Sequence, residues 1–514
     1  MDADVIIVGA GPAGLMLASE LCLAGVRPLV LERHPGQQET PKASGFNGQI
    51  VELLRYRGLL SRVEAAAGRR VHPAPSAPFG GLQLDFSHLP DSPIWAVPIP
   101  QARLERVLGE RAAELGTGIR RGHEVTAVSQ DGTTVIATVR APAGPCRLTA
   151  RYLVGCDGAR SAVRETARIP FPGITYPQVN RLARATVPDS VTRLDNGELD
   201  VPGLGRIHAG FTQTDRGVFA FGSLTGGDLL IQTTEDEAAG VSDDKPLTLE
   251  ELQDSIRRVL GGDLPLANVT RLSRYGFQAR QAERYRDKRI LLAGDAAHQF
   301  PATGIGINVG MIDAVNLAWK LAAVVADRMP ASLLDTYHQE RHYAGARALL
   351  QTQAQVALRR GQDPAAEALR ELFGELLTDE QPLRHLGALI AGTSIRYPMP
   401  GPGQHALAGT FAPDLPLQTG QSTTSVADLM RDARPVLLDL AGRTDLRQIA
   451  QDWRHRIDIV TASAGDRPAD ALLIRPDAYI AWAAATGEPA GTAAPALRQA
   501  LIQWFGTPRE RNAA

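Results

Sequence analysis

The stretch VIIVGAGPAGLMLASELCLAGVRPLVLE, residues 5–32, decides the fold of this chain. It opens with a continuous apolar run rich in β-branched residues, which predicts a buried strand over residues 5–8. Residues 15–24 have the composition of a helix that Gly25 closes, and residues 28–32 form a second strand-like run. A strand, a glycine loop, a helix and a strand in this order require a parallel sheet that is covered on both faces.

The loop before the helix carries the pattern G-x-G-x-x-G at Gly9, Gly11 and Gly14. Glycines at these positions allow a tight turn and the close approach of a pyrophosphate, which then meets the positive end of the helix. Glu32 ends the second strand, where its carboxylate can accept hydrogen bonds from a ribose diol. A tight turn without a ligand is the alternative for the glycines alone. With the strand, the helix and the acid at this spacing, the stretch predicts a nucleotide-binding site.

Two further motifs lie at the ends of apolar strands. The segment GCDGARSAVR, residues 155–164, contains Asp157, and a capped strand-to-helix turn is its alternative explanation. The segment LAGDAAH, residues 292–298, contains Asp295 and precedes GIGIN at residues 304–308 and a helix. A carboxylate at a strand end can bind a second diol, and a helix N-terminus behind glycines can stabilise an anionic ring. Another loop of the parallel sheet is the alternative for this third motif.

The rest of the chain divides into segments of different character. Three β-rich runs, the last over residues 147–154, predict an antiparallel meander, and a later strand-rich block with one amphipathic helix predicts a separate antiparallel sheet. Proline and glycine over residues 397–403 indicate a linker to a small α/β domain. The predicted domains are a discontinuous first domain over residues 1–180 and 270–395, an inserted sheet domain over residues 181–269, and a C-terminal domain over residues 404–514.

Composition and charge exclude several classes of protein. The chain has 514 residues, of which 44% are hydrophobic and 21% charged, as in soluble proteins of several domains. A formal net charge of -2 provides no field for a polyanion, so nucleic acid is not expected as a partner. Three cysteines without a C-x-x-C pair suit the reducing cytoplasm, which is the predicted location. No association with a membrane is expected, because no stretch is judged long enough to span one. No metal is expected, because His338 and His342 lack a third ligand.

The three motifs, in this order and at these spacings, resemble the single-component FAD-dependent aromatic hydroxylases of the para-hydroxybenzoate hydroxylase type. The most similar subgroup oxidises aromatic polyketides such as angucyclines, anthracyclines and tetracyclines. The resemblance covers nearly the whole chain, including DAVNLAWKL at residues 313–321, YHQER at residues 337–341 and LLIRPD at residues 472–477. It implies an α/β fold with a Rossmann-like FAD-binding domain, an inserted antiparallel β-sheet substrate domain and a C-terminal thioredoxin-like domain. All cysteines lie at or before Cys156, so a packing or dimer role is expected for the last domain, without dithiol chemistry.

The resemblance also implies which residues hold FAD. The glycine loop holds the pyrophosphate, the end of the second strand holds the AMP moiety, and the third motif holds the ribityl chain and the pyrimidine end of the flavin. Asp157 is shared between FAD support and the binding of the nicotinamide cofactor. The implied cofactor-binding residues are Gly9, Gly11, Ala13, Gly14, Glu32, Arg33, Lys42, Gln101, Arg103, Val125, Asp157, Asp295, Gly306, Ile307 and Asn308.

The implied activity is that of a monooxygenase in which the flavin, and no catalytic side chain, carries the chemistry. NADPH or NADH binds transiently and reduces FAD, O2 adds at C4a, and the flavin C4a-hydroperoxide transfers one oxygen atom to a polycyclic aromatic substrate. The substrate is expected between the flavin and the antiparallel sheet. There Phe211, Phe219 and Phe221 are candidate walls, with core packing as their alternative, and His298 is a candidate polar contact. A monomer or a homodimer is expected.

Three rival activities stay open. A Baeyer–Villiger oxygenase would use the same fold, a dehydrogenase or reductase would incorporate no oxygen, and a redox-silent flavin-binding protein is suggested by an altered loop. Relatives often carry GGQGMN where this chain has TGIGIN at residues 303–308, and Gln49 stands where many carry Arg. These departures leave FAD binding intact, because it depends on the backbone, but the identity of the substrate does not follow. Hydroxylation is favoured over ketone insertion, because Lys42 and Arg103 have flavin-binding explanations and no further cation marks a peroxide-stabilising site.

Overall fold

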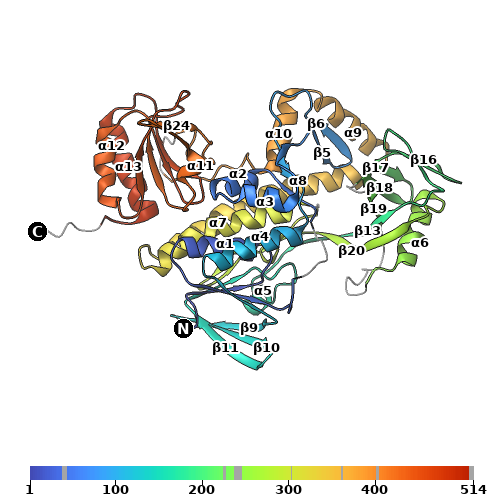
Figure 1. The fold of residues 1–514 in the computed structure, drawn as a ribbon, viewed down its shortest axis with the longest axis horizontal. Coiled ribbons are helices and arrows are strands. Elements are labelled where there is room, and N and C mark those ends of the chain that lie inside the picture. Colours follow the sequence, from blue (N-terminus) through green and yellow to red (C-terminus); the bar gives the residue numbers. More distant parts are fainter. Residues whose placement is uncertain are drawn as a thin grey trace, which may run out of the picture.

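The computed structural model describes residues 1–37, 43–223, 227–236, 246–301, 304–360, 363–400 and 405–508. The described chain is a mixed α/β protein with several antiparallel sheets (Figure 1). Two six-stranded sheets and a C-terminal four-stranded sheet form its framework. Lys42, which the resemblance assigns to FAD, lies outside the described residues.

The first six-stranded sheet contains the strand and helix that the opening stretch predicts. β1 (Val5–Val8) lies between β12 (Tyr152–Gly155) and β2 (Pro28–Glu32), and the three strands run parallel. Every residue of β1 is buried, as a sheet covered on both faces requires. α1 (Pro12–Leu23) packs against α7 (Ile305–Val325). The other strands of this sheet are β22 (Ile290–Leu292), β21 (Arg286–Asp287) and β8 (Gly118–Arg121), and α4 (Gln101–Glu114) also packs on α1.

The predicted antiparallel meander consists of β9 (Glu124–Gln130), β10 (Val135–Ala141) and β11 (Gly144–Ala150). The prediction of one strand over residues 147–154 was wrong. The chain leaves the meander at Arg151 and enters the parallel sheet as β12, where Tyr152 pairs with Val5. The meander therefore ends directly beside the strand that carries Asp157.

The second six-stranded sheet is antiparallel between all neighbouring strands. Its order is β17 (Gly210–Thr214), β18 (Gly217–Ser223), β19 (Leu229–Asp236), β13 (Gly173–Thr186), β20 (Ala267–Gln281) and β23 (His298–Gln299). β13 and β20 extend this sheet beyond the predicted segment 181–269 at both ends. β20 could not be predicted from the sequence, because most of its side chains are half-buried and it has no clear apolar alternation. Helix α6 (Leu249–Leu260) covers one face of the sheet.

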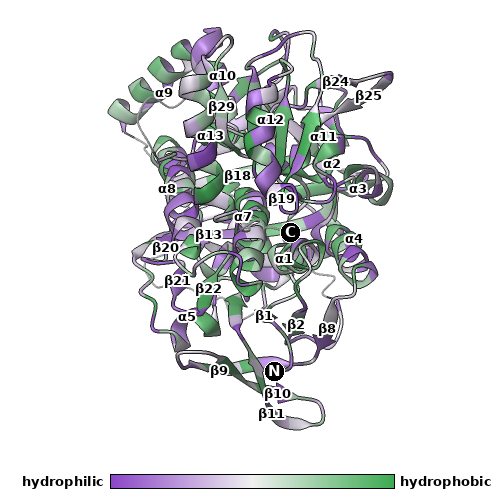
Figure 2. Cartoon of the chain, turned by 90° about the vertical axis from the view of Figure 1, so that its left-hand side faces the viewer, coloured by the Kyte–Doolittle hydropathy of each residue, from purple (hydrophilic) through white to green (hydrophobic). Residues whose placement is uncertain are grey.

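Two long helices, α7 and α8 (Leu333–Arg360), follow the last strands of the two sheets. α7 is long and apolar enough, by length and composition, to cross a membrane, contrary to the prediction, but 83% of its apolar window is buried inside the protein. It is the core helix between α1 and α8. In Figure 2 hydrophilic residues predominate on α8, whereas hydrophobic ones gather on the inner helices and strands. α9 (Pro364–Leu376) and α10 (Glu380–Ala391) then pack against α8.

Residues 405–508 contain a four-stranded sheet that packs on the first part of the chain. Arg57, which follows α2 (Gln49–Tyr56), donates to the carbonyl oxygens of Pro476 at 2.6 Å and Met430 at 2.9 Å and is buried. The sheet order is β27 (Asp458–Thr461), β26 (Val436–Asp439), β28 (Ala471–Ile474) and β29 (Ile480–Ala484), with helices α11 (Val426–Leu429), α12 (Thr444–Ala450) and α13 (Ala490–Phe505).

Shorter elements complete the described fold. They are β3 (Phe46–Asn47), α3 (Leu60–Ala67), β4 (His72–Pro73), β5 (Ser76–Phe79), β6 (Leu82–Asp85), β7 (Trp95–Val97), α5 (Ala162–Thr166), β14 (Thr192–Arg193), β15 (Leu199–Val201), β16 (Gly205–Ile207), β24 (Pro416–Thr419) and β25 (Ser422–Ser425).

Candidate functional site

A cleft of about 590 Å³ opens at the carboxyl ends of β1, β2, β12 and β22. Ligands of open α/β sheets bind at this edge, because the loops that follow the strands converge there. All three predicted motifs contribute to its wall. The predicted residues that line it are Gly9, Gly11, Ala13, Glu32, Arg33, Gln101, Val125, Asp157, Asp295, Gly306 and Ile307.

The three glycines of the first motif have different structural reasons. Gly9 has a φ of +105°, and a Cβ there would lie 2.4 Å from the carbonyl oxygen of Cys156. A Cβ at Gly14 would lie 2.1 Å from the carbonyl oxygen of Gly9, so Gly14 allows the loop to pack on the helix and does not itself line the cleft. Gly11 has open space around it. The cleft wall therefore presents bare backbone beside the N-terminus of α1, as a pyrophosphate requires.

Glu32 shapes the loop and also lines the cleft. Its Oε2 accepts a hydrogen bond from the backbone N–H of Ala10 at 2.8 Å, and its Oε1 accepts one from the N–H of His34 at 2.9 Å. Each carboxylate oxygen retains acceptor capacity for a hydroxyl donor. Arg33 is exposed and Val125 lines the same end of the cleft. These positions suit the ribose and adenine of a nucleotide.

Asp157 lines the cleft, and one of its carboxylate oxygens has no partner in the described part of the chain. Its Oδ2 accepts from the N–H of Val163 at 3.1 Å, whereas Oδ1 is buried and has no hydrogen-bond partner among the described residues. Burial raises the pKa of this carboxyl above its ordinary value. A buried acceptor without a donor is costly in a folded protein. A ligand hydroxyl or amide would satisfy it.

Asp295 lies over the first turn of α7. A Cβ built on Gly306 would be 3.1 Å from Asp295 Oδ1, so the glycine lets the carboxylate approach the helix. Gly306 and Ile307 line the cleft at the positive end of this helix. Asn308 is engaged elsewhere: its Nδ2 donates to Asn47 Oδ1 at 3.0 Å, and its Oδ1 accepts from the Asn47 N–H at 3.3 Å.

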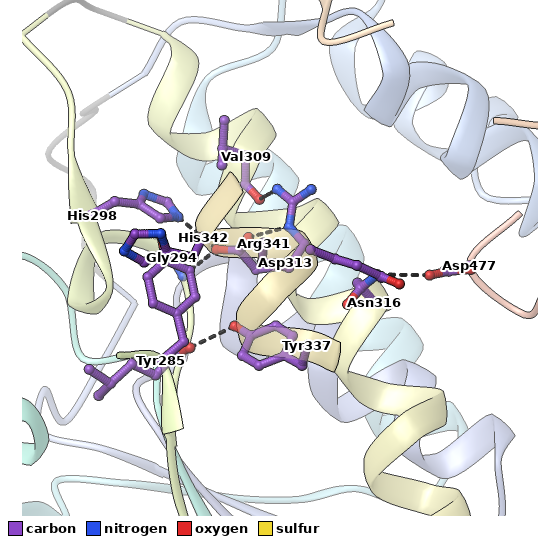
Figure 3. Close-up of polar contacts among 12 residues, drawn as sticks. Tyr285, Gly294, His298, Val309, Asp313, Asn316, Tyr337, Arg341, His342 and Asp477 are labelled. Carbon is purple, nitrogen blue, oxygen red and sulfur yellow. Dashed lines mark hydrogen bonds and ion pairs between the residues drawn. The ribbon is translucent and has the colours of Figure 1, made fainter. Parts of the chain in front are cut away.

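A buried carboxylate, Asp313 on α7, fixes the turn that carries Asp295 (Figure 3). Its Oδ2 accepts from the Gly294 N–H at 3.0 Å and from His298 Nε2 at 2.7 Å, and its Oδ1 accepts from Arg341 Nε at 2.6 Å. His298 is fully buried, does not line the cleft and holds the turn from behind. Its role as a polar substrate contact stays a prediction.

Some predicted residues lie away from the cleft. Arg103 is exposed, and its Nη1 donates to the carbonyl oxygen of Ala66 at 3.3 Å. Phe219 and Phe221 are buried in the core under α6. They therefore pack in the core, which was the alternative given for them. Phe211 is 49% exposed on edge strand β17. The three phenylalanines lie on β17 and β18, at the edge of the sheet opposite to β23.

The cleft is also lined by residues that were not predicted from the sequence. Glu105 follows Gln101 by one helical turn and accepts from its Nε2 at 2.8 Å, a spacing that could have been used to find it. Tyr275 and Gln278 enter from β20, and Phe300 from the loop after β23. They carry no local motif, because tertiary folding alone brings β20 to the cleft. Among the described residues, no group of His, Cys, Asp and Glu could hold a metal ion.

Comparison with known proteins matches most of the chain. Residues 2–352 match the family described as FAD binding domain, and residues 405–508 match the family described as aromatic-ring hydroxylase, C-terminal. A 12-dehydrotetracycline 5-monooxygenase/anhydrotetracycline 6-monooxygenase from Streptomyces rimosus subsp. rimosus is 42% identical over 518 residues, covering 99% of this chain and 100% of the relative. A dialkyldecalin synthase from Streptomyces rugosporus is 37% identical over 516 residues, covering 98% and 99%. A solved aromatic hydroxylase from angucycline biosynthesis has a TM-score of 0.88 at 38% identity, covering 99% and 100%.

Proposed function

The chain belongs to the FAD-dependent aromatic-ring hydroxylases, and from this membership we propose that it consumes NADPH and O2 to hydroxylate a polycyclic, polyketide-type aromatic compound. That it is a flavoprotein monooxygenase follows from the family itself. The observation that carries the proposal is the cleft, which brings together a glycine loop, the carboxylates of Glu32, Asp157 and Asp295, and the N-terminus of α7. We name NADPH as the reductant, and not NADH, only because the chain resembles this family.

The residues of the cleft fit FAD. FAD, when bound, supplies hydride acceptance and the activation of dioxygen, which no side chain can provide. The backbone at Gly11 and the start of α1 would hold the pyrophosphate, Glu32 the adenosine ribose and Asp295 the ribityl hydroxyls. The unpartnered Oδ1 of Asp157 is an acceptor for a further hydroxyl or amide donor.

The N-terminus of α7 is proposed to stabilise negative charge at the pyrimidine end of the flavin. This helix spans 21 residues, and Gly306 and Ile307 in its first turn line the cleft. The unsatisfied N–H groups of a helix N-terminus carry partial positive charge. Such a fixed dipole needs no reorganisation during a reaction, so it favours the reduced, anionic form of the ring.

The reaction is tested with the full-length, FAD-loaded protein. Polycyclic aromatic compounds, including anhydrotetracycline, are incubated with NADPH and 18O2, and the products are examined by mass spectrometry. The proposal predicts one labelled hydroxyl on an intact carbon skeleton. A labelled ester or lactone would establish the Baeyer–Villiger alternative, and oxidised product without label would indicate a dehydrogenase.

A second candidate function is favoured by one relative, the dialkyldecalin synthase, whose name describes a synthase and not an oxygenase. A chain of this family that binds flavin without turning it over is therefore a specific rival. The rate of NADPH oxidation separates the two, since aromatic ligands accelerate it in hydroxylases. A yellow protein that never oxidises NADPH, with any ligand that binds it, would favour the redox-silent alternative.

We also propose the cytoplasm as the location, because Cys22, Cys146 and Cys156 are all free. A thioredoxin-like arrangement of the C-terminal sheet, a Rossmann-like first domain, and the predicted domain limits are proposed on the same resemblance. A monomer or a homodimer is the proposed assembly, which sedimentation of the full-length protein would test.

A further inference from the structure

Several arginines around the second sheet are paired with carboxylates, while Arg280 of β20 donates to the carbonyl oxygen of Phe171 and the hydroxyl of Thr175. On the α6 face, Arg181 contacts Glu235 at 3.2 Å and Glu251 at 2.8 Å, and Arg274 also binds Glu251. Three more pairs follow the same rule: Arg258 with Glu235 at 2.8 Å, Arg184 with Asp228, and Arg360 with Asp236 at 3.4 Å. Such pairing is expected, because a partly buried guanidinium without a counter-charge loses hydration without compensation.

Arg271 and Arg359 are exceptions. Neither forms an ion pair with a carboxylate in the described part of the chain, and burial lowers the pKa of each guanidinium below its ordinary value. The Nε of Arg271 is buried and has no hydrogen-bond partner there. The guanidinium of Arg359 lies over the ring of Phe277, 4.7 Å from its centroid. These two desolvated cations therefore lack the partner that their neighbours have.

Both exceptions lie around one residue of the cleft, Tyr275. Side chains alternate along a strand, so Arg271, Tyr275 and Phe277 of β20 share a face opposite to that of Arg274, which binds the α6 side. Arg359 comes from the end of α8, which packs over β20. Burial raises the pKa of Tyr275 to about 12, while the nearby Arg359 and Arg271 act to lower it. Tyr275 itself lines the cleft.

The same face carries neutral polar groups. The Tyr275 hydroxyl donates to Gln232 Oε1 at 3.3 Å, and Gln232 Nε2 donates to Asn180 Oδ1 at 3.0 Å. The ring of Tyr275 meets that of Phe277 edge to face, with centroids 5.9 Å apart. Aromatic rings, amides and two unpaired guanidinium groups thus lie together along about 20 Å of strand.

We propose that Arg271 and Arg359, on either side of Tyr275, form a binding site for an anionic oxygen group of the aromatic substrate. The ligand class is a polycyclic aromatic compound with an ionised enol, phenol or carboxyl at the end away from the flavin. The planar fork of arginine suits two oxygens of such a group, and the charge of the ligand would replace the missing carboxylate. This inference rests on the proposed function, since it places the substrate against this sheet.

The phosphates of NADPH are a second source of anionic oxygen, so the test uses both ligands. The variants are R271Q and R359Q in the full-length, FAD-loaded protein. The matched controls are R184Q and R360Q, which remove arginines that have carboxylate partners. Arg184 lies on β13 directly opposite Arg271, and Arg360 follows Arg359 on α8. The aromatic probes are anthraquinone-2-carboxylate and its neutral carboxamide, with affinities measured by titration calorimetry. NADPH affinity is measured in parallel.

The proposal predicts that the wild-type protein binds the carboxylate at least tenfold more tightly than the carboxamide. R271Q and R359Q should lose this preference, whereas R184Q and R360Q should keep it. Equal binding of the two probes by the wild type, or binding of neither, would overturn the inference. So would a loss confined to NADPH, which would assign the arginines to the dinucleotide. The 18O2 experiment tests the proposed function independently, because it uses the wild-type protein and reads the product.

Stability provides a second measurement. Because the two cations have no carboxylate partner among the described residues, R271Q and R359Q should leave the melting temperature of the ligand-free protein unchanged or raise it. A fall of several degrees in both variants, larger than in R184Q and R360Q, would show that the arginines support the fold and would overturn the proposed binding role.

Discussion

At the scale of single residues, Asp313 holds the turn at residues 294–298 in place. It is fully buried and accepts hydrogen bonds from Gly294, His298 and Arg341 (Figure 3). Removing one charge of a buried pair leaves the other uncompensated, at a cost of about 3 to 5 kcal/mol. D313N should therefore lower the free energy of unfolding by about 3 kcal/mol and release FAD more readily. Urea unfolding and flavin absorbance measure the two effects.

The control for this variant is D335N, which removes a 59% exposed partner of Arg286. Surface pairs contribute about 1 kcal/mol or less, so this variant should behave like the wild type.

Burial alone would raise the pKa of Asp313, but Arg341 and His298 hold it below its ordinary value. A carboxyl whose pKa is lower in the folded state stabilises the fold at neutral pH, and this contribution is lost as pH falls below about 4. D313N should remove that part of the acid sensitivity.

The glycine loop gives a second residue-scale prediction. An alanine at Gly14 would place its Cβ 2.1 Å from a backbone oxygen, whereas one at Gly11 meets nothing within 4 Å. G14A should therefore cost about 1 to 3 kcal/mol of stability, as overpacking does. G11A should fold normally but weaken FAD about tenfold or more, because its methyl group enters the space for the pyrophosphate. Thermal unfolding and FAD titration separate the two, and equal behaviour in both assays would contradict the assignment.

At the scale of secondary-structure elements, the second sheet has two faces with different roles. Phe219 is fully buried under α6, while Phe211 on the edge strand is 49% exposed. F219A should cost about 3 to 5 kcal/mol without a specific effect on ligand affinity. F211A should change stability by no more than about 0.5 kcal/mol. Chemical denaturation tests this, and weaker aromatic binding by a fully stable F219A would restore the phenylalanine as a substrate wall.

The same elements show what could be predicted from sequence. β1, α1 and β2 follow from local pattern, because an apolar run, a glycine loop and an acid all lie within 28 residues. β20 has no such pattern, since neighbours on both sides half-bury it. Tyr275, which lies on this strand and lines the cleft, was therefore not predicted from the sequence. The bond between His298 and Asp313 is equally invisible, because it depends on the packing of α7 behind the flavin loop. The motifs therefore predicted the lining at the carboxyl ends of β1, β2, β12 and β22, whereas the lining from β20 required the tertiary structure.

At the scale of the whole molecule, the C-terminal unit is joined to the first part of the chain by buried charges. Arg475 is fully buried and contacts Glu340 of α8 at 2.6 Å, and Asn316 of α7 donates to Asp477 at 2.9 Å. Tyr479 donates to Gln49 at 3.0 Å. Without this unit, Glu340 would lose its cationic partner Arg475, and Asn316 would lose the acceptor Asp477.

Truncation after residue 400 should therefore damage folding and solubility more than it damages reduction of bound FAD by NADPH. R475M tests the same contact in the full-length chain and should cost about 3 to 5 kcal/mol, because it leaves Glu340 short of a cation. The matched control is R434Q, whose pair with Asp458 is 42% exposed on both sides and should contribute about 1 kcal/mol or less. All three cysteines lie at or before Cys156, so dithiol exchange cannot explain any loss. A soluble truncated protein with wild-type stability would show that the C-terminal unit is not structural, and the search for its role would then turn to assembly.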